Sequence, residues 1–197
     1  MIKKVILIYP PFSMAERYGT GLDAIGTCLP PLGLLSLAAV LEENGYEVKV
    51  YDSDLLNSTV GEMVDYVKDF DPDFVGIYCN TSNYNRVIDY ADSIKKIIKV
   101  PICLGGPHPI IMPKDVLKNK SVDLVIMGEG ELTIIELLEF LNKEKDLSAV
   151  KGLAFKEKGG NIVINEKREP IKDLDTLPMP ARHLVEIENA EVQMGTI

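Results

Sequence analysis

The chain has 197 residues, a hydrophobic fraction of 46% and a formal net charge of −9. This length suits one full domain with an appendage, and the acidic balance argues against nucleic acid or an anionic membrane as the main partner. No apolar run approaches a membrane span, and the N-terminus is too short for a signal peptide. The three cysteines, Cys28, Cys79 and Cys103, are far apart in the chain and form no metal-ligand cluster. They suit a reducing compartment, so we expect a cytoplasmic protein.

Apolar runs of strand length alternate with helical patterns over the first three quarters of the chain. In chain order, we expect buried strands to begin near Lys4, Glu47, Phe74, Ile102 and Leu124. Apolar residues at helical spacing follow the first strand from Leu34 to Leu41, and Gly45 is a stop signal. Thr59 and Glu62 form a potential capping box for the next helix, and Pro113 suits the first position of a short helix.

Five strand–helix units in succession predict an α/β fold with a parallel sheet covered on both faces. The flavodoxin-like, or Rossmann-like, strand order 2-1-3-4-5 is the leading topology. After Lys143 the pattern predicts a hairpin around Gly159 and Gly160, and then an extended, Pro-broken linker. We therefore divide the chain into a domain over residues 1–145 and a hairpin and linker over 146–197. We expect linker residues such as Leu177 and Leu184 to be poorly packed and left for intermolecular contacts.

Ligands of such a fold bind beyond the carboxyl ends of the strands. The segment between the first strand and its helix, residues 10–33, is much longer than usual, as functional loops often are. Gly105-Gly106 ends the fourth strand, and Gly128-Glu129-Gly130 follows the fifth, just before a helix N-terminus. Glycines there permit positive φ and close approach of a ligand, and free N–H groups favour a phosphate. Together these loops predict a large ligand with a sugar-phosphate part.

Three familiar classes fit the loops poorly. A receiver domain needs acidic residues after the first strand and an Asp at the end of the third, where this chain has Tyr9-Pro10 and Tyr78-Cys79. A flavodoxin needs a first loop rich in Ser, Thr and Gly, whereas this loop begins Pro10-Pro11-Phe12. A dinucleotide fold needs its glycine fingerprint after the first strand, whereas here Gly-x-Gly follows the fifth.

Four stretches, "PPLGLLSLAAVLEENGYEVKVYD", "GGPHP", "MGEGELT" and "LPMPARHL", together resemble the N-terminal part of cobalamin-dependent radical SAM enzymes. The resemblance covers nearly the whole chain and implies a cobalamin-binding domain. It also implies a catalytic domain that would follow in cis, with a [4Fe–4S] cluster and S-adenosylmethionine. The sequence contains no Cys-x-x-x-Cys-x-x-Cys motif, so we do not expect this chain alone to be an enzyme. Methyl transfer fits the family best, although it also includes ring-forming and other oxidative members.

The resemblance departs from the family pattern at the first loop. Many cobalamin domains carry Asp-x-His-x-x-Gly there, and its His ligates cobalt; this chain has "LDAIG", and no His precedes Gly106. The resemblance therefore implies cobalamin with its benzimidazole displaced and no His on cobalt, an arrangement that eases transfer of a methyl group. We expect His108 to contact the nucleotide tail or to stabilise its turn.

The resemblance assigns cobalamin contacts to loops at the carboxyl ends of the strands. The nucleotide tail would be lined by Pro11, Gly33, Ser82, Gly105, Gly106, His108, Gly128, Glu129 and Gly130, and the corrin would rest near Asn80 and Thr81. A second interpretation stays open: a stand-alone flavodoxin-like domain that binds another nucleotide or a protein and takes no cobalamin.

Overall fold

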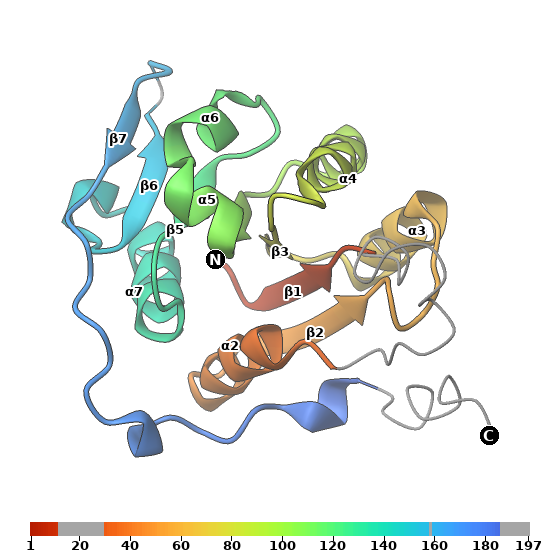
Figure 1. Cartoon of the computed structure of the whole chain (residues 1–197), viewed down its shortest axis with the longest axis horizontal. Coiled ribbons are helices and arrows are strands. Elements are labelled where there is room, and N and C mark those ends of the chain that lie inside the picture. Colours follow the sequence, from red (N-terminus) through yellow and green to blue (C-terminus); the bar gives the residue numbers. More distant parts are fainter. Residues whose placement is uncertain (12–29, 158, 186–197) are drawn as a thin grey trace.

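The structure is a computed structural model that describes residues 1–11, 30–157 and 159–185. Its centre is a seven-stranded sheet in the order β2-β1-β3-β4-β5-β6-β7 (Figure 1). The strands are β1 (Lys4–Tyr9), β2 (Glu47–Asp52), β3 (Phe74–Tyr78), β4 (Ile102–Gly105), β5 (Leu124–Ile126), β6 (Leu153–Lys156) and β7 (Ile162–Ile164). The first five strands are parallel, so the predicted starts, direction and order of these strands are confirmed.

Helices connect the parallel strands. They are α2 (Leu32–Glu43), α3 (Val60–Phe70), α4 (Tyr84–Ile97), α5 (Pro107–Ile111), α6 (Pro113–Lys118) and α7 (Glu131–Asn142), with short 3-10 turns η1 (Leu147–Ala149), η2 (Leu174–Thr176) and η3 (Arg182–Leu184). The capping box of Thr59 and Glu62 is present, and Pro113 opens α6. The stretch after Gly106, expected as a loop, forms α5 because Pro107 is preset for the first turn of a helix.

The hairpin of β6 and β7 is part of the main sheet, which its sequence does not predict. β6 pairs antiparallel with β5, with Leu124 opposite Phe155, and β7 pairs antiparallel with β6. The free edge of β5 offers backbone N–H and C=O groups that need partners, and the hairpin supplies them. The sheet therefore has seven strands rather than five. The division of the chain at residue 145 stays a prediction.

Two hydrophobic clusters cover the two faces of the sheet. On one face, Leu7, Phe74 and Cys103 pack under α2 and α7. On the other, Ile6 and Ile77 pack under α3, α4 and α6. Neighbouring residues of a strand point to opposite faces, so the continuous apolar runs of the sequence supply both clusters.

The segment after β7 runs along α7 and then along α2 (Figure 1). The Ala181 N–H donates to the Leu35 carbonyl at 3.0 Å, and Leu177 and Leu184 pack half-buried against the cluster under α2 and α7. The expectation that these two leucines are left for intermolecular contacts is wrong, because backbone hydrogen bonds hold the segment on its own domain. Met179 stays 84% exposed.

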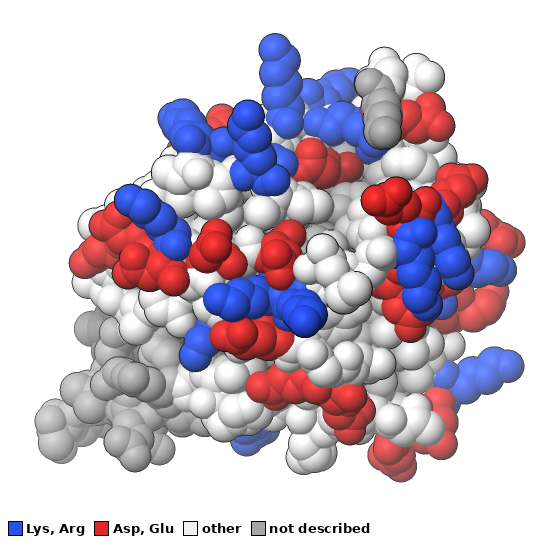
Figure 2. Space-filling model, turned by 180° about the vertical axis from the view of Figure 1, so that it is seen from behind, with Lys and Arg blue, Asp and Glu red and all other residues white. Residues whose placement is uncertain are grey.

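The surface carries charges of both signs. The side opposite to the view of Figure 1 shows acidic and basic side chains intermixed (Figure 2). Among the residues that the structure describes, no helix combines the length and the apolar character that a membrane crossing requires.

Candidate functional site

A cavity of about 270 Å³ opens at the carboxyl ends of the parallel strands, between the sheet and helices α2 and α7. Its lining comes from four strands, two helices and the loops that join them. The lining residues are Leu7, Gly33, Leu34, Leu37, Phe74, Gly76, Ile77, Tyr78, Cys103, Gly105, Gly106, Ile126, Gly128, Glu129, Gly130, Glu131 and Ile134. The cavity lies at the edge of the sheet where ligands of this fold bind.

The floor of the cavity follows the two-residue period of the strands. Phe74, Gly76 and Tyr78 alternate along β3, and Cys103 and Gly105 alternate along β4, so all five share one face of the sheet. Bulky side chains form the inner part of this floor, and glycines lie nearer the carboxyl ends. The cavity is therefore open at its rim and closed by apolar side chains at its inner end.

Two rim glycines border open space. A Cβ built on Gly33 or on Gly105 would meet no atom within 4 Å, and neither residue has a positive φ. Gly128 also borders open space, but its φ of +85° is rarely adopted by other residues. A side chain at Gly33 or Gly105 would therefore enter the cavity without straining the backbone.

Gly106 has a different reason to be glycine. Its φ is +110°, and a Cβ there would lie 2.6 Å from the Cys79 carbonyl oxygen and 3.1 Å from the Tyr78 ring. The Tyr78 ring in turn stacks on Tyr9, with 5.0 Å between ring centroids. The space beside Gly106 is thus filled by the protein itself.

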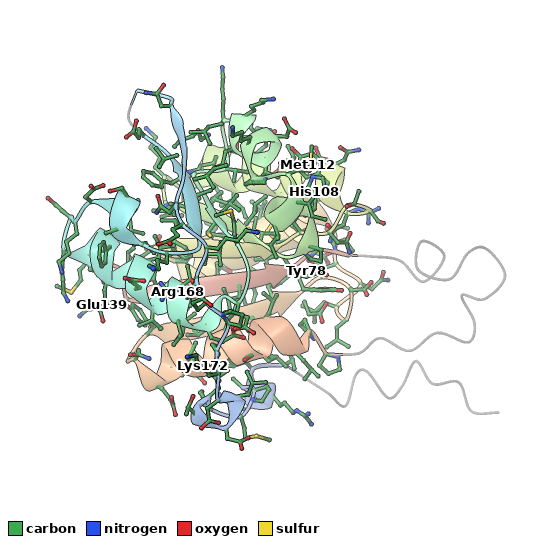
Figure 3. All side chains as sticks on the ribbon, turned by 60° about the vertical axis from the view of Figure 1, so that its left-hand side comes forward. Tyr78, His108, Met112, Glu139, Arg168 and Lys172 are labelled. Atoms are coloured by element: carbon green, nitrogen blue, oxygen red, sulfur yellow. The ribbon has the colours of Figure 1, made fainter. Side chains whose placement is uncertain are left out.

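His108 ties together the loops that follow β3 and β4. The Nδ1 atom of its ring lies 3.3 Å from the Thr81 hydroxyl, and the ring packs against the Tyr84 ring with 4.5 Å between centroids. Its backbone N–H donates to the Cys79 carbonyl at 3.3 Å. Tyr78 and His108 lie near each other on one side of the molecule (Figure 3). These contacts join the two loops within the chain, and the role of His108 towards a nucleotide tail stays a prediction.

The segment after β7 contacts the loop that follows β5. The Ile171 N–H donates to the Glu129 carboxylate at 2.6 Å, and the Arg168 guanidinium bonds to Thr133 and Glu136 of α7 (Figure 3 labels Arg168). Glu129 therefore has a backbone partner within the chain. A Cβ on Gly130 would lie 2.9 Å from a Leu37 methyl group, so this glycine lets α2 approach the loop.

The structure divides the predicted site residues into two groups. Gly33, Gly105, Gly106, Gly128, Glu129 and Gly130 line the cavity, whereas Pro11, Asn80, Thr81, Ser82 and His108 lie outside its lining. Within the second group, Thr81 and Ser82 are exposed, the Asn80 and Asn83 side chains cap each other's backbone N–H groups, and the Pro11 carbonyl accepts a hydrogen bond from Arg86. Most of the first loop, residues 12–29, is outside the described residues.

Sequence reasoning missed the apolar part of the lining. Leu7, Leu37, Phe74, Tyr78, Cys103, Ile126 and Ile134 look like ordinary core residues of strands and helices. Gly76, a glycine inside a buried strand, marks close approach of another side chain rather than the cavity, because a Cβ there would lie 2.7 Å from a Leu7 methyl group.

Burial raises the pKa of the Cys103 thiol to about 12 and raises that of Cys79 to about 12 as well. Both thiols are therefore neutral at physiological pH, which makes them poor nucleophiles and poor metal ligands. Among the described residues, no group of three or more His, Cys, Asp or Glu side chains could hold a metal ion. The cavity thus offers shape and apolar surface rather than reactive side chains.

Comparisons with known proteins place these features in context. The family model "B12 binding domain" matches residues 20–138. The uncharacterized methyltransferase PH0819 of Pyrococcus horikoshii is 34% identical over 95% of this chain and 40% of its own length. Cytidylyl-2-hydroxyethylphosphonate methyltransferase of Streptomyces wedmorensis is 28% identical over 94% of this chain and 41% of its own length.

Solved structures share the fold. The radical enzyme OxsB with aqua-cobalamin and S-adenosylmethionine bound superposes with a TM-score of 0.79 at 21% identity, over 98% of this chain and 25% of that one. The methyltransferase TsrM of Kitasatospora setae with cobalamin and a [4Fe–4S] cluster bound gives 0.71 at 17% identity, over 91% of this chain and 31% of that one. The chain thus spans well under half the length of these relatives.

Proposed function

Because the chain belongs to the B12-binding domain family, we propose that it holds cobalamin at the carboxyl ends of the parallel strands, with the nucleotide tail in the cavity under α2 and α7. The observation that carries the proposal is the glycine rim of that cavity, where Gly33 and Gly105 leave open space for a ligand. Small-molecule sites generally measure about 300–1,000 Å³. A cavity of about 270 Å³ suits one part of a large cofactor, and the tail is the part narrow enough to enter.

The parts of the chain around the cavity have distinct roles in this proposal. The N–H groups at the start of α7, next to the Gly128–Gly130 loop, favour the phosphate of the tail. The corrin is too wide for the cavity and would lie outside it, near Asn80, Thr81 and Ser82. When bound, cobalamin supplies a carrier for a methyl group; this chain binds and orients it.

We further propose that no His of this chain ligates cobalt. His108 already contacts Thr81 and Tyr84, and His183 lies 3.1 Å from Glu42 on α2. Electron paramagnetic resonance of the cob(II)alamin state tests this directly. We expect no nitrogen superhyperfine splitting from a protein His; a splitting that disappears in His108→Ala would overturn this part of the proposal.

The wider proposal is that this domain serves a radical SAM enzyme, of which methyl transfer is the best-supported activity. The support is that two similar proteins are named as methyltransferases and that each is much longer than the region it shares with this chain. A catalytic domain in cis would then supply the [4Fe–4S] cluster and the site for S-adenosylmethionine.

The visible spectrum of the chain after incubation with hydroxocobalamin and gel filtration tests the function. We expect the corrin absorbance to elute with the protein in a saturable, one-to-one ratio. Elution of folded protein without the chromophore would favour the second interpretation, a flavodoxin-like domain that takes no cobalamin.

A further inference from the structure

We propose that the cavity selects among cobamides by the lower base of the nucleotide tail, accepting an apolar base such as dimethylbenzimidazole or a phenol and disfavouring adenine. This inference rests on the proposed function, because it concerns which tail the same cavity accepts. It follows from the distribution of polar groups along the cavity.

The inner lining is apolar. Among the described residues, the lining side chains on this face that are almost completely buried are all hydrophobic: Leu7, Leu34, Phe74, Cys103, Ile126 and Ile134. The polar or acidic lining side chains, Tyr78, Glu129 and Glu131, are half-buried or exposed. A base that reaches the inner part of the cavity therefore lies beyond the polar lining side chains, which are at the rim.

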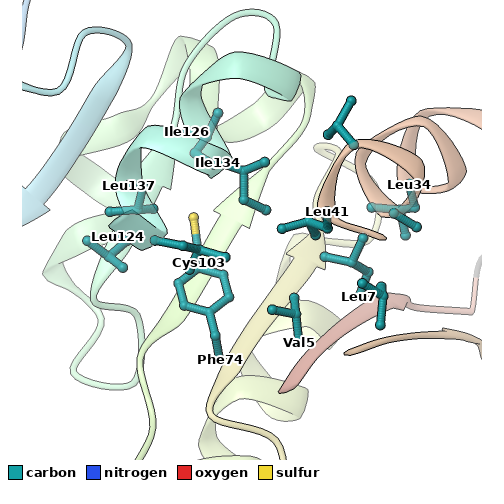
Figure 4. Close-up of a cluster of buried hydrophobic side chains, with 14 of the residues drawn as sticks. Val5, Leu7, Leu34, Leu41, Phe74, Cys103, Leu124, Ile126, Ile134 and Leu137 are labelled. Carbon is teal, nitrogen blue, oxygen red and sulfur yellow. The ribbon is translucent and has the colours of Figure 1, made fainter. Parts of the chain in front are cut away.

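The cavity is long enough for a base to lie beyond the polar rim and beside the apolar inner lining. Its lining on β3 runs from Tyr78 at the carboxyl end to Phe74 at the amino end, a span of roughly 13 Å. Figure 4 shows Phe74, Cys103 and Ile134 among the side chains that meet between the sheet and α7. The inner end thus lies deep between these elements, away from bulk water.

Two polar groups close to the lining, the hydroxyl of Thr133 next to Ile134 in α7 and the thiol of Cys103, already have partners. The Thr133 hydroxyl accepts from Arg168 at 2.8 Å and lies 3.4 Å from the carbonyl oxygens of Glu129 and Lys151. The Cys103 thiol faces the Leu104 carbonyl at 3.8 Å. The backbone of β3 and β4 is engaged in the parallel ladder. Within the described lining, nothing at the inner end offers a hydrogen bond to a base.

The candidate bases differ in how many hydrogen bonds they lose on entry. Adenine carries an exocyclic amino group and several ring nitrogens, benzimidazole has one ring nitrogen beyond its bond to the sugar, and a phenol-derived base has no ring nitrogen. A buried donor or acceptor without a partner costs its desolvation. We therefore expect the adenine cobamide to bind roughly tenfold or more weakly than cobalamin.

Calorimetric titration of the full chain with separate cobamides tests the selection. The probes are cobalamin, the adenine cobamide, a phenolyl cobamide and cobinamide, which lacks the nucleotide tail. The benzimidazole of cobalamin must leave cobalt before it can enter, and this cost works against the expected order. The phenolyl form avoids the cost, so it should bind at least as tightly as cobalamin, and cobinamide should bind more weakly than both.

A pair of cysteine variants locates the source of the selectivity. Cys103→Ser places a hydroxyl in the inner lining, whereas Cys79→Ser makes the same change in the cluster on the opposite face. We expect Cys103→Ser to bring the dissociation constants of cobalamin and the adenine cobamide closer together. Cys79→Ser should leave the ratio of these two constants unchanged. Should Cys103→Ser fail to fold, the comparison of ligands on the unaltered chain carries the test alone.

The outcomes separate this inference from the function on which it rests. Tight binding of cobalamin together with equal binding of the adenine cobamide would overturn the selectivity and leave the proposed function intact. If Cys79→Ser reduced the selectivity and Cys103→Ser did not, the source of the selectivity would lie outside the cavity. That result would overturn the inference. No binding of any cobamide would overturn the proposed function itself.

Discussion

The two faces of the sheet are built from similar residues but are filled to different degrees. Under α3, α4 and α6, side chains such as Ile6, Ile94 and Leu104 are completely buried. Under α2 and α7, an equally apolar cluster leaves a cavity of about 270 Å³ at the carboxyl ends of the strands. The difference arises at the rim, where Gly33, Gly105 and Gly128 add no side chains. One face therefore stabilises the fold, while the other also provides room for a ligand.

A matched pair of isoleucines should show the largest difference between the faces. Ile94 of α4 is completely buried on the filled face, and Ile134 of α7 is 2% exposed and lines the cavity. Ile94→Ala should lower the free energy of unfolding by about 2–5 kcal/mol. Ile134→Ala should cost less, about 2 kcal/mol or below, because one side of Ile134 already lacks packing partners. Urea denaturation without cobalamin measures both; a larger cost for Ile134→Ala would contradict the comparison.

A side chain placed in the cavity should block the ligand without unfolding the protein. Gly105→Val adds its methyl groups to open space in a strand that tolerates valine. Overpacking against a bound tail should weaken cobalamin binding by roughly 10- to 100-fold, measured by spectroscopic titration. Gly159→Val, in the hairpin turn with no atom near its Cβ position, is the control and should bind like the unaltered chain.

Gly106→Val is a poorer probe of the cavity. Its φ of +110° and the close Cys79 carbonyl would strain any side chain there, so a loss of stability would accompany any loss of binding.

The two buried thiols, one on each face, should make the protein sensitive to alkali. Burial raises their pKa values to about 12, whereas an unfolded Cys titrates near about 8.5. The unfolded chain therefore releases the thiol protons at a lower pH than the folded chain. The free energy of unfolding keeps its full value below about pH 8.5 and falls as the pH rises toward 12. The loss should approach about 1.4 kcal/mol per pH unit for each thiol.

Denaturation at pH 8, 9 and 10 checks this dependence. The double variant Cys79→Ser, Cys103→Ser should show a shallower decline over this range. An identical decline in the double variant would assign the alkaline sensitivity to other groups.

His108 lies outside the cavity lining, so its effect should be the smallest. His108→Ala removes the contacts with Thr81 and Tyr84 and should weaken cobalamin binding by a factor that corresponds to about 1 kcal/mol. The absorption spectrum of the bound cobalamin should not change. A changed spectrum would indicate that His108 reaches cobalt.

The sheet and its rim were predictable because their signals are local. The strand starts at Lys4, Glu47 and Phe74 follow from apolar runs bounded by turn residues, and the glycines after β4 and β5 mark the edge where ligands bind. The pairing of β6 with β5 was missed, because it depends on which strand edge remains free after the parallel sheet has formed. The packing of Leu177 and Leu184 was missed for a similar reason, since their partners lie on distant helices.

The inner part of the site could not be predicted, because an apolar residue that lines a cavity looks like one that fills a core. Phe74 and Cys103 have the same pattern in the sequence as Val75 and Leu104, which pack on the other face. Only the three-dimensional arrangement distinguishes them. Gly76, in the middle of β3, does not reveal the cavity either, because the space beside it is filled by the Leu7 side chain.

Methyl NMR of the isoleucine side chains tests most directly whether cobalamin occupies the face under α2 and α7. Ile126 and Ile134 line the cavity, whereas Ile6 and Ile94 belong to the cluster on the opposite face. On addition of cobalamin, we predict that the methyl resonances of Ile126 and Ile134 shift through the ring current of the inserted base and that those of Ile6 and Ile94 do not. Shifts confined to Ile6 and Ile94, or bound cobalamin with no shift at Ile126 and Ile134, would contradict the assignment of the cavity.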